Sequence, residues 1–329
     1  MLTIKENLLE TIKGGNPDRF VNQYEFLGII MEDPLSQRNL RPKRGEPDKV
    51  DGWGVTISWP DHVPGPFPVH DEEHKVLKDI TKWRDVVQAP RTDAPEEEWA
   101  NYIAEAEAVD RNEQFLTVFQ APGIFEQLHY LMGMDDTLIN FHEEPEAMHE
   151  LIDYIVDYKI ACAHSCLKRI KPEAIFQHDD WGSQINSFLS PAMFEEFLVP
   201  AYKKLYGFWR ENGVELIVHH CDSYAANLVP HMIEMGIDIW QGCLSTNNNP
   251  ELIKKYGGKI SFMGDIDNGL VDREDWTQEI IAKEVERACR SCGKLYFIPS
   301  TTMGLAQTVY PGVYEAVSKE IDRMSKEMF

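Results

Sequence analysis

The stretch VELIVHHCD, residues 214–222, decides how the chain is expected to fold. A short apolar run that ends abruptly in polar side chains is typical of a parallel strand buried on both faces. The pattern recurs in AIFQHDD (174–180), DIWQGC (238–243), ISFMGDID (260–267) and LYFIPSTT (295–302). These five runs predict a parallel sheet whose strand ends gather polar groups at one edge.

Three earlier runs bring the expected number of strands to eight: RFVNQYEF (19–26), WGVTISW (53–59) and FLTVFQAPG (115–123). Helix signals alternate with them, namely a capping box from Thr3 to Glu6, Ser190 before Pro191, Asn249 before Pro250, and Gly293 at a helix end. The alternation predicts a single (β/α)8 barrel spanning residues 1–329. An open doubly wound sheet would alternate in the same way, but its G-x-G-x-x-G signature is absent after every early strand.

Charge and composition narrow the classes of partner. The chain has 55 acidic and 32 basic residues and a formal net charge of -23, which would repel phosphate backbones and anionic membranes. The first fifteen residues form a charged amphipathic pattern without the apolar run of a signal peptide. We therefore expect a cytoplasmic protein without nucleic acid or membrane partners, and its six cysteines are expected to be mostly free thiols.

The stretch of about residues 31–82 is rich in proline and charge and is longer than an ordinary strand-to-helix connection. It predicts an elaborated loop region. Two interpretations remain open, a lid over the barrel mouth and a structural excursion without a further role.

A metal site is the first candidate for chemistry, because active sites in such barrels lie at the carboxyl ends of the strands. Alternation along a strand is expected to point His219 and Cys221 the same way, which offers an imidazole and a thiolate to one zinc ion. Cys243 ends the next strand and is a conditional third ligand. On this hypothesis, Cys221→Ala loses the metal.

Further polar groups end the neighbouring strands. Asp179 and Asp180 are candidate catalytic acids or bases, together with His220. The candidate substrate-binding residues are strand-end polar groups or aromatic side chains suited to a flat ligand: Trp53, Phe119, His178, Trp181, Asp265, Asp267 and Thr301.

Across nearly its full length the chain resembles the uroporphyrinogen decarboxylase superfamily. The resemblance is carried by NPDRF (16–20), HDDWGSQ (178–184), SPAMFEEFLVPAYKKL (190–205), HHCDSYAANLVPHMIEMGIDIWQG (219–242), KKYGGKISFMGDID (254–267) and LYFIPSTT (295–302). The decarboxylases themselves carry an arginine-rich RQAGRY-like segment after the first strand, where this chain has YEFLGIIMEDPL (24–35). The resemblance is therefore closer to the corrinoid-linked methyltransferase branch, whose H-x-C motif corresponds to His219 and Cys221.

The resemblance implies a zinc-dependent methyltransferase that demethylates a methoxylated aromatic compound and passes the methyl group to the Co(I) of a corrinoid protein. It also allows a homodimer. The branch has a further cysteine where this chain has Pro299, Ser300 and Thr301, which leaves Cys243, Asp179, Asp180 or a glutamate to complete the zinc site. Fewer thiolates make zinc a stronger Lewis acid, which suits an ether oxygen.

Three alternatives remain at this point. The first is a methylcobamide:thiol methyltransferase of the coenzyme M type. The second is a uroporphyrinogen decarboxylase-like decarboxylase for a smaller acid, for which Arg38, Arg41, Lys43 and Arg44 form the dense basic group. The third is a corrinoid- or ligand-binding barrel without catalysis. Measuring the metal content of the protein would distinguish this non-catalytic barrel from the metal-dependent enzymes.

Overall fold

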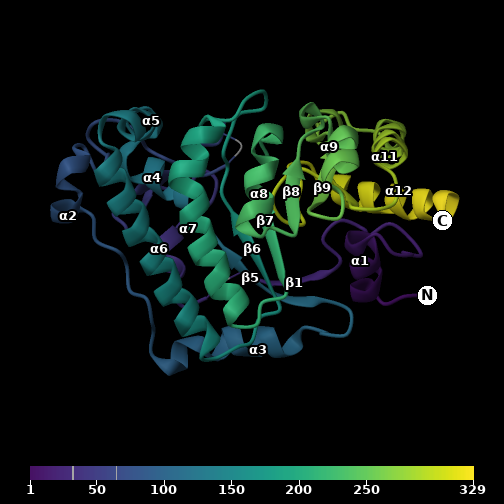
Figure 1. Ribbon diagram of the computed structural model, residues 1–329, viewed down its shortest axis with the longest axis horizontal. Coiled ribbons are helices and arrows are strands. Elements are labelled where there is room, and N and C mark those ends of the chain that lie inside the picture. Colours follow the sequence, from purple (N-terminus) through teal and green to yellow (C-terminus); the bar gives the residue numbers. More distant parts are fainter. Residues whose placement is uncertain (32, 64) are drawn as a thin grey trace.

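A curled parallel sheet forms the centre of the protein. The computed structural model describes residues 1–31, 33–63 and 65–329. Within them, seven parallel strands follow the order β1-β5-β6-β7-β8-β9-β10 (Figure 1). The strands are β1 (Leu27–Ile30), β5 (Phe115–Gln120), β6 (Ala174–His178), β7 (Leu216–His220), β8 (Ile239–Cys243), β9 (Ser261–Ile266) and β10 (Phe297–Thr301). The predicted α/β barrel architecture is confirmed, and the carboxyl ends of the strands lie at one edge.

Two of the eight predicted strands are placed differently. Residues 19–26 turn, because Gln23 has a positive φ of 51° and the N–H of Leu27 donates to the carbonyl of Tyr24 at 3.0 Å. The first strand therefore begins at Leu27, just after the predicted run.

The run 53–59 is the second difference. It supplies β3 (Thr56–Ser58) to a separate antiparallel sheet with β2 (Lys49–Val50) and β4 (Phe67–Pro68). Its side chains alternate between buried and half-buried, which suits a sheet with one solvated face better than a barrel strand buried on both. The barrel consequently has seven parallel strands within the described residues, where the sequence predicted eight.

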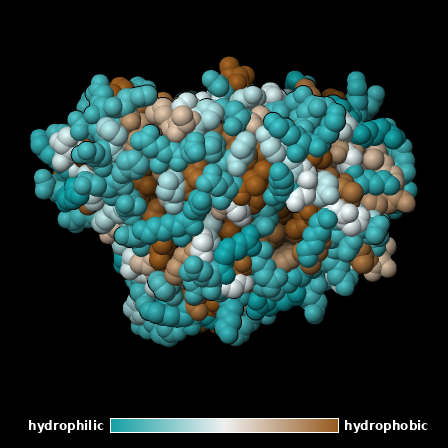
Figure 2. All heavy atoms as spheres, in the orientation of Figure 1, coloured by the Kyte–Doolittle hydropathy of each residue, from teal (hydrophilic) through white to brown (hydrophobic). Residues whose placement is uncertain are grey.

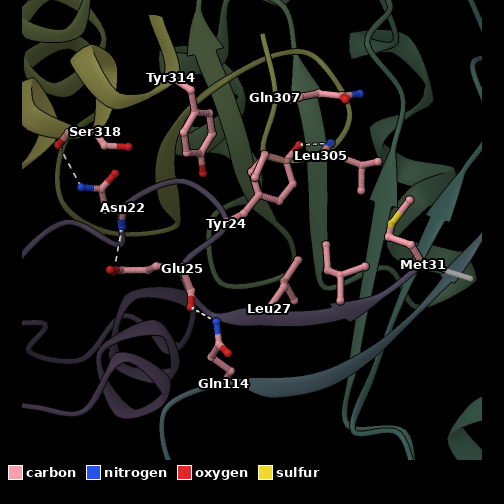
Figure 3. A pocket seen from close by; sticks show the side chains of 12 residues that line it. Asn22, Tyr24, Glu25, Leu27, Met31, Gln114, Leu305, Gln307, Tyr314 and Ser318 are labelled. Carbon is pink, nitrogen blue, oxygen red and sulfur yellow. Dashed lines mark hydrogen bonds between the residues drawn. The ribbon is translucent and has the colours of Figure 1, made fainter. Parts of the chain in front are cut away.

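Side chains join the two sheet edges, β10 and β1. The Tyr24 hydroxyl donates to the carbonyl of Met303 at 2.9 Å and accepts from the N–H of Leu305 at 3.0 Å. The amide oxygen of Gln23 accepts from the N–H of Thr301 at 3.3 Å. A cavity of 660 Å³ lies at this seam, and Figure 3 shows Tyr24, Leu27 and Tyr314 around it.

Helices cover the outside of the sheet (Figure 1). They are α1 (Ile4–Lys13), α2 (Trp83–Val86), α3 (Ala100–Ala108), α4 (Ile124–Met132), α5 (Met134–Glu143), α6 (Pro145–Leu167), α7 (Pro191–Glu211), α8 (Val229–Met235), α9 (Asn249–Tyr256), α10 (Asn268–Val271), α11 (Gln278–Cys292) and α12 (Val313–Met328). Several predicted helix ends are confirmed: Thr3 forms the capping box with Glu6, Ser190 caps α7, and Gly293 follows the end of α11. The structure assigns the N-cap of α9 to Asn248 rather than Asn249.

The two faces of the sheet form two different cores. Phe176, Val218 and Ile239 belong to a cluster inside the barrel, together with residues of β1, β5, β9 and β10. Ile217 and Trp240 belong instead to the large cluster between the sheet and the helices. The direction of each polar side chain at a strand end follows from this alternation.

The outer surface agrees with the acidic composition. Figure 2 shows a mostly hydrophilic face with apolar side chains scattered over it. Within the described ranges, every helix is too short or too polar to cross a bilayer. All six cysteines are buried free thiols, as expected.

Tyr24→Phe tests the contribution of the seam. The change leaves the N–H of Leu305 without its acceptor, so we expect the free energy of unfolding to fall by about 1–3 kcal/mol in urea denaturation. Tyr310→Phe is the control, because the hydrogen bonds described for Tyr310 use backbone atoms only. Equal stability of the two variants would show that the tyrosine bridge does not hold the seam.

Candidate functional site

The carboxyl ends of β6 and β7 bring three ligating side chains together. A nitrogen from each of His178 and His220 and an oxygen from Asp180 all lie within 4.8 Å of one another. The two imidazole rings are 4.4 Å apart, and β6 and β7 pair with these two histidines in register. The cluster therefore lies on the barrel-interior side of neighbouring strand ends, where barrel enzymes place their chemistry.

Each histidine of the cluster is oriented through its other ring nitrogen. His178 Nδ1 lies 2.9 Å from a carboxylate oxygen of Glu126 at the start of α4. His220 Nδ1 contacts the amide oxygen of Gln241 in β8, and Gln241 in turn donates to the carbonyl of Met303 at 3.3 Å. Metal-binding histidines are commonly held in this way by a carboxylate or a carbonyl oxygen. The hydrogen bonds described for the two histidines use Nδ1 only, and His178 would have to lose a proton to bind a metal ion through Nε2.

The electrostatics of the cluster follow from burial and the Glu126 carboxylate. Burial alone would lower the pKa of His178, but Glu126 outweighs it and raises this pKa to about 9. Burial alone would raise the pKa of Glu126. The neighbouring His178 outweighs burial and lowers this pKa to about 2. Burial lowers the pKa of His220 well below its usual value, and the neighbouring His178 lowers it further. His220 is therefore a neutral imidazole, the form that binds a metal ion.

A second carboxylate, Asp222, lies next to the cluster. Its backbone N–H donates to Asp180 at 2.9 Å. Desolvation raises the pKa of Asp222 well above its usual value, and the Asp180 carboxylate adds to the shift. Desolvation also raises the pKa of Asp180 to about 6, while His178 opposes this change.

The predicted metal ligands His219 and Cys221 do not meet at the barrel mouth. Both ring nitrogens of His219 are engaged: Nδ1 lies 2.6 Å from the Tyr206 hydroxyl and Nε2 lies 3.2 Å from the carbonyl of Asp179. Cys221 is fully buried in the cluster between sheet and helices, with its sulfur 3.4 Å from the backbone N–H of Trp181. His219 and Cys221 thus face the same side of the sheet, as predicted, but this side is the helix layer. His220 occupies the interior position instead.

Cys243 also belongs to the helix-facing core. Its thiol donates to the carbonyl of Trp240 at 3.0 Å, and burial raises its pKa well above the usual value. Cys243 therefore lies on the opposite face of the sheet from the histidine cluster.

Asp179, a predicted catalytic residue, holds the start of α4. Its carboxylate accepts from the backbone N–H groups of Phe125 and Glu126, at 3.0 and 2.8 Å, and from the Tyr202 hydroxyl at 2.6 Å. These contacts satisfy N–H groups that a helix start leaves without partners. A Cβ at Gly123 would lie 2.1 Å from Asp179, so this close approach requires glycine. The position of Asp179 is therefore structural rather than at the cluster.

The aromatic residues predicted to bind substrate lie in different places. Phe119 lines a cavity of 390 Å³ at the barrel mouth. Trp181 stacks on His219 with ring centroids 4.0 Å apart, on the helix side of the sheet. Trp53 packs against Tyr158 at 4.9 Å. The structure thus places Phe119 at an open cavity and the two tryptophans in packed surroundings.

The polar residues predicted from β9 and β10 lie apart from the histidine cluster. The buried Asp265 carboxylate forms an ion pair with the exposed Arg287 of α11 at 2.9 Å. A positive φ at Gly264 and at Asp265 itself accompanies this irregular strand end. Asp267 caps α10, and the backbone N–H of Thr301 donates to Gln23 in the seam. None of these three contacts includes a residue of the cluster.

Sequence reasoning missed Glu126, Asp222 and Gln241. Glu126 had a usable signal, since a glutamate three residues after a helix N-cap commonly points back toward the helix start. Asp222 also had a usable signal. It lies two residues after His220, and this spacing places both side chains on the same face of a strand. Gln241 had none, because its partner is known only from the pairing of β7 with β8.

Comparison with known proteins gives one family and a solved structure of the same fold. The model of the uroporphyrinogen decarboxylase (URO-D) family matches residues 54–324. A methyltransferase from Methanosarcina mazei superposes with a TM-score of 0.67 and 12% identity, covering 98% of this chain and 99% of its own. A modular endo-β-1,4-mannanase from Cellulomonas fimi gives a TM-score of 0.40 and 13% identity, covering 97% of this chain and 76% of its own. No curated protein sequence matches the chain.

Adjacent alanine substitutions test the separation of Asp179 from Asp180. Asp179→Ala leaves two backbone N–H groups and the Tyr202 hydroxyl without an acceptor, so the free energy of unfolding should fall by about 3 kcal/mol or more. Asp180→Ala removes a half-buried carboxylate and leaves a single backbone N–H, that of Asp222, without its acceptor, so it should cost less, about 1–2 kcal/mol. Chemical denaturation measures both, and the reverse ranking would contradict the placement of the two side chains.

Proposed function

The chain belongs to the uroporphyrinogen decarboxylase (URO-D) family, and from this premise we propose that it is a methyltransferase. The proposed methyl donor is a methoxylated aromatic compound, and the acceptor is the Co(I) of a corrinoid carried by a partner protein. The shared fold with the methyltransferase from Methanosarcina mazei supports this choice within the family. The single observation that carries it is the cluster of His178, Asp180 and His220 at the carboxyl ends of β6 and β7.

The proposed metal is zinc, held by His178, Asp180 and His220. This donor set replaces the one predicted from sequence, because two imidazoles and a carboxylate converge here while His219 and Cys221 face the helix layer. Zinc accepts such nitrogen and oxygen ligands, and the contacts from Glu126 and Gln241 provide the supporting orientation. When bound, zinc would supply a Lewis acid for the ether oxygen of the donor.

The reaction breaks the O–CH3 bond of the donor, and its electron pair stays on the oxygen. The corrinoid of the partner protein would supply Co(I), whose electron pair would form the new bond to the methyl group, and a proton from solvent would complete the phenol. The residues of this chain would bind and position the donor. Phe119 stacks on Phe176 at 5.9 Å, and the buried Phe176 ring lies 6.1 Å from the His220 ring, so packed aromatic rings connect Phe119, which lines the mouth cavity, with the cluster.

Decarboxylation is the second candidate, which the description of the matching family model favours. It predicts release of CO2 from an acid instead of methyl transfer. Transfer of a methyl group from a corrinoid to a thiol has less support, because the cluster offers nitrogen and oxygen atoms whereas thiol activation suits thiolate-rich sites.

The zinc content of variants shows which residues bind the metal, those of the cluster in the structure or the pair His219 and Cys221 predicted from the sequence. We expect His178→Ala and His220→Ala to lower zinc affinity by about tenfold to a hundredfold or more, because each removes a ligand. Cys221→Ala should keep zinc and methyl transfer near wild-type levels, because its sulfur lies in the helix-facing core. Elemental analysis after dialysis against zinc measures the first effect.

Activity is measured by incubating the protein with methoxylated aromatics and a Co(I) corrinoid and following the absorbance change of methyl-cobalt formation. Methoxylated aromatic acids are also tested for the release of CO2. Methyl transfer that needs His178 and His220 supports the proposal. CO2 release without methyl transfer would favour the decarboxylase instead.

A further inference from the structure

The chain crosses the His220 ring just after β10, in a covering segment of residues 302–305. A Cβ built on Gly304 would lie 3.2 Å from Cε1, 3.3 Å from Nε2 and 3.5 Å from Cδ2 of His220. These nearly equal distances place Gly304 over the face of the ring, because an approach along the Nε2 lone pair would leave both carbons farther away. The backbone of the covering segment therefore lies against one face of a proposed metal ligand.

Backbone conformation does not explain the glycine at this position. Gly304 is not among the glycines with a positive φ, so its backbone would accept an alanine without strain. A Cβ there would approach the ring more closely than ordinary van der Waals contact allows, so the ring or the segment would have to move. At Gly207 in α7, by contrast, a Cβ would meet nothing within 4 Å beyond its own helix in the described chain. The contact with His220 is what excludes a side chain at residue 304.

Hydrogen bonds fix the covering segment on both sides of its glycine. The amide oxygen of Asn268 accepts from the backbone N–H of Thr302 at 2.7 Å. The Tyr24 hydroxyl donates to the carbonyl of Met303 at 2.9 Å and accepts from the N–H of Leu305 at 3.0 Å. The glycine lies between these anchored residues, so its position over the ring is set from both directions.

Gln241 connects the covering segment with the ring itself. Its Nε2 donates to the carbonyl of Met303 at 3.3 Å and to that of Thr301 at 3.4 Å, while its amide oxygen contacts Nδ1 of His220. The side chains of Gln241 and His220 are both buried. Because one planar amide makes the contacts to the segment and to the ring, the position of the segment and the rotation of the ring depend on each other.

We propose that the covering segment fixes the His220 ring for metal binding, with Gly304 as its positioning residue. The contact with Gln241 determines which ring nitrogen faces the cluster, and the backbone at Gly304 limits the tilt of the ring. A metal ligand needs both, because its lone pair must point at the ion. The segment covers a face of the ring and leaves the Nε2 lone pair in the ring plane, 3.9 Å from an oxygen of Asp180. This inference rests on the proposed function for the identity of the cluster as a zinc site.

Co²⁺ binding by the metal-free protein tests this role, because the visible absorption of Co²⁺ reports both its affinity and the geometry of its ligands. We expect Gly304→Ala to weaken Co²⁺ binding by about tenfold to a hundredfold and to change the shape of the absorption band, since the displaced ring no longer points at the ion. Gly207→Ala is the matched control and should keep the wild-type affinity and spectrum. Urea denaturation of the metal-free variants measures their stability separately.

Asn268→Ala loosens the covering segment from its other side, and no hydrogen bond described for Asn268 includes His220. We expect weaker Co²⁺ binding and a changed absorption band here as well, by a smaller factor than in Gly304→Ala. A segment with a merely structural role would lose stability in this variant and keep the Co²⁺ spectrum. This variant decides the question if Gly304→Ala fails to fold.

Wild-type affinity and spectrum in Gly304→Ala, or in Asn268→Ala if the first variant does not fold, would overturn the proposal. Co²⁺ binding that is undiminished in His220→Ala, or absent from the wild type, would overturn it together with the proposed zinc site. Methyl transfer to a Co(I) corrinoid is measured separately on the zinc-loaded wild type. Metal binding that depends on Gly304 without any methyl transfer would leave the positioning role standing and defeat the proposed function. Methyl transfer by the wild type, with unchanged metal binding in Gly304→Ala, would do the reverse.

Discussion

The alternation of side chains along β7 is the constraint on which the candidate site depends. Successive residues of a buried strand face opposite layers, so His219 and His220 have different surroundings. Val218 lies in the barrel interior, whereas Ile217 and Cys221 pack in the helix-facing core. The register of β6 and β7 then places His220 beside His178.

The same alternation gives different roles to three consecutive residues at the end of β6. His178 and Asp180 contribute to the cluster, while Asp179 between them accepts hydrogen bonds from the start of α4. Because α4 is held in this way, it can present Glu126 to His178. A structural contact on one face of the sheet thus supports the electrostatics on the other.

Much of this arrangement could be predicted from the sequence, and the exceptions have physical reasons. The apolar runs located six strands of the barrel, β5 to β10, and the edge where polar side chains gather. The run LIVHH is buried on both faces, so its composition carries no signal for which histidine faces inward. The apolar residues of WGVTISW predict a barrel strand, although their alternation with half-buried residues suits a half-solvated sheet. The partner of Asp265 could not be foreseen, because Arg287 meets it only through the packing of α11 on an irregular strand end.

The most direct test of the central claim is the X-ray absorption spectrum of the zinc-loaded protein. Zinc held by His178, Asp180 and His220 would show only nitrogen and oxygen neighbours at about 2.0–2.2 Å, including scattering from two imidazole rings. A sulfur neighbour at about 2.3 Å would mean that a cysteine such as Cys221 binds the metal. That result would contradict the inward orientation of His220 and the account built on it.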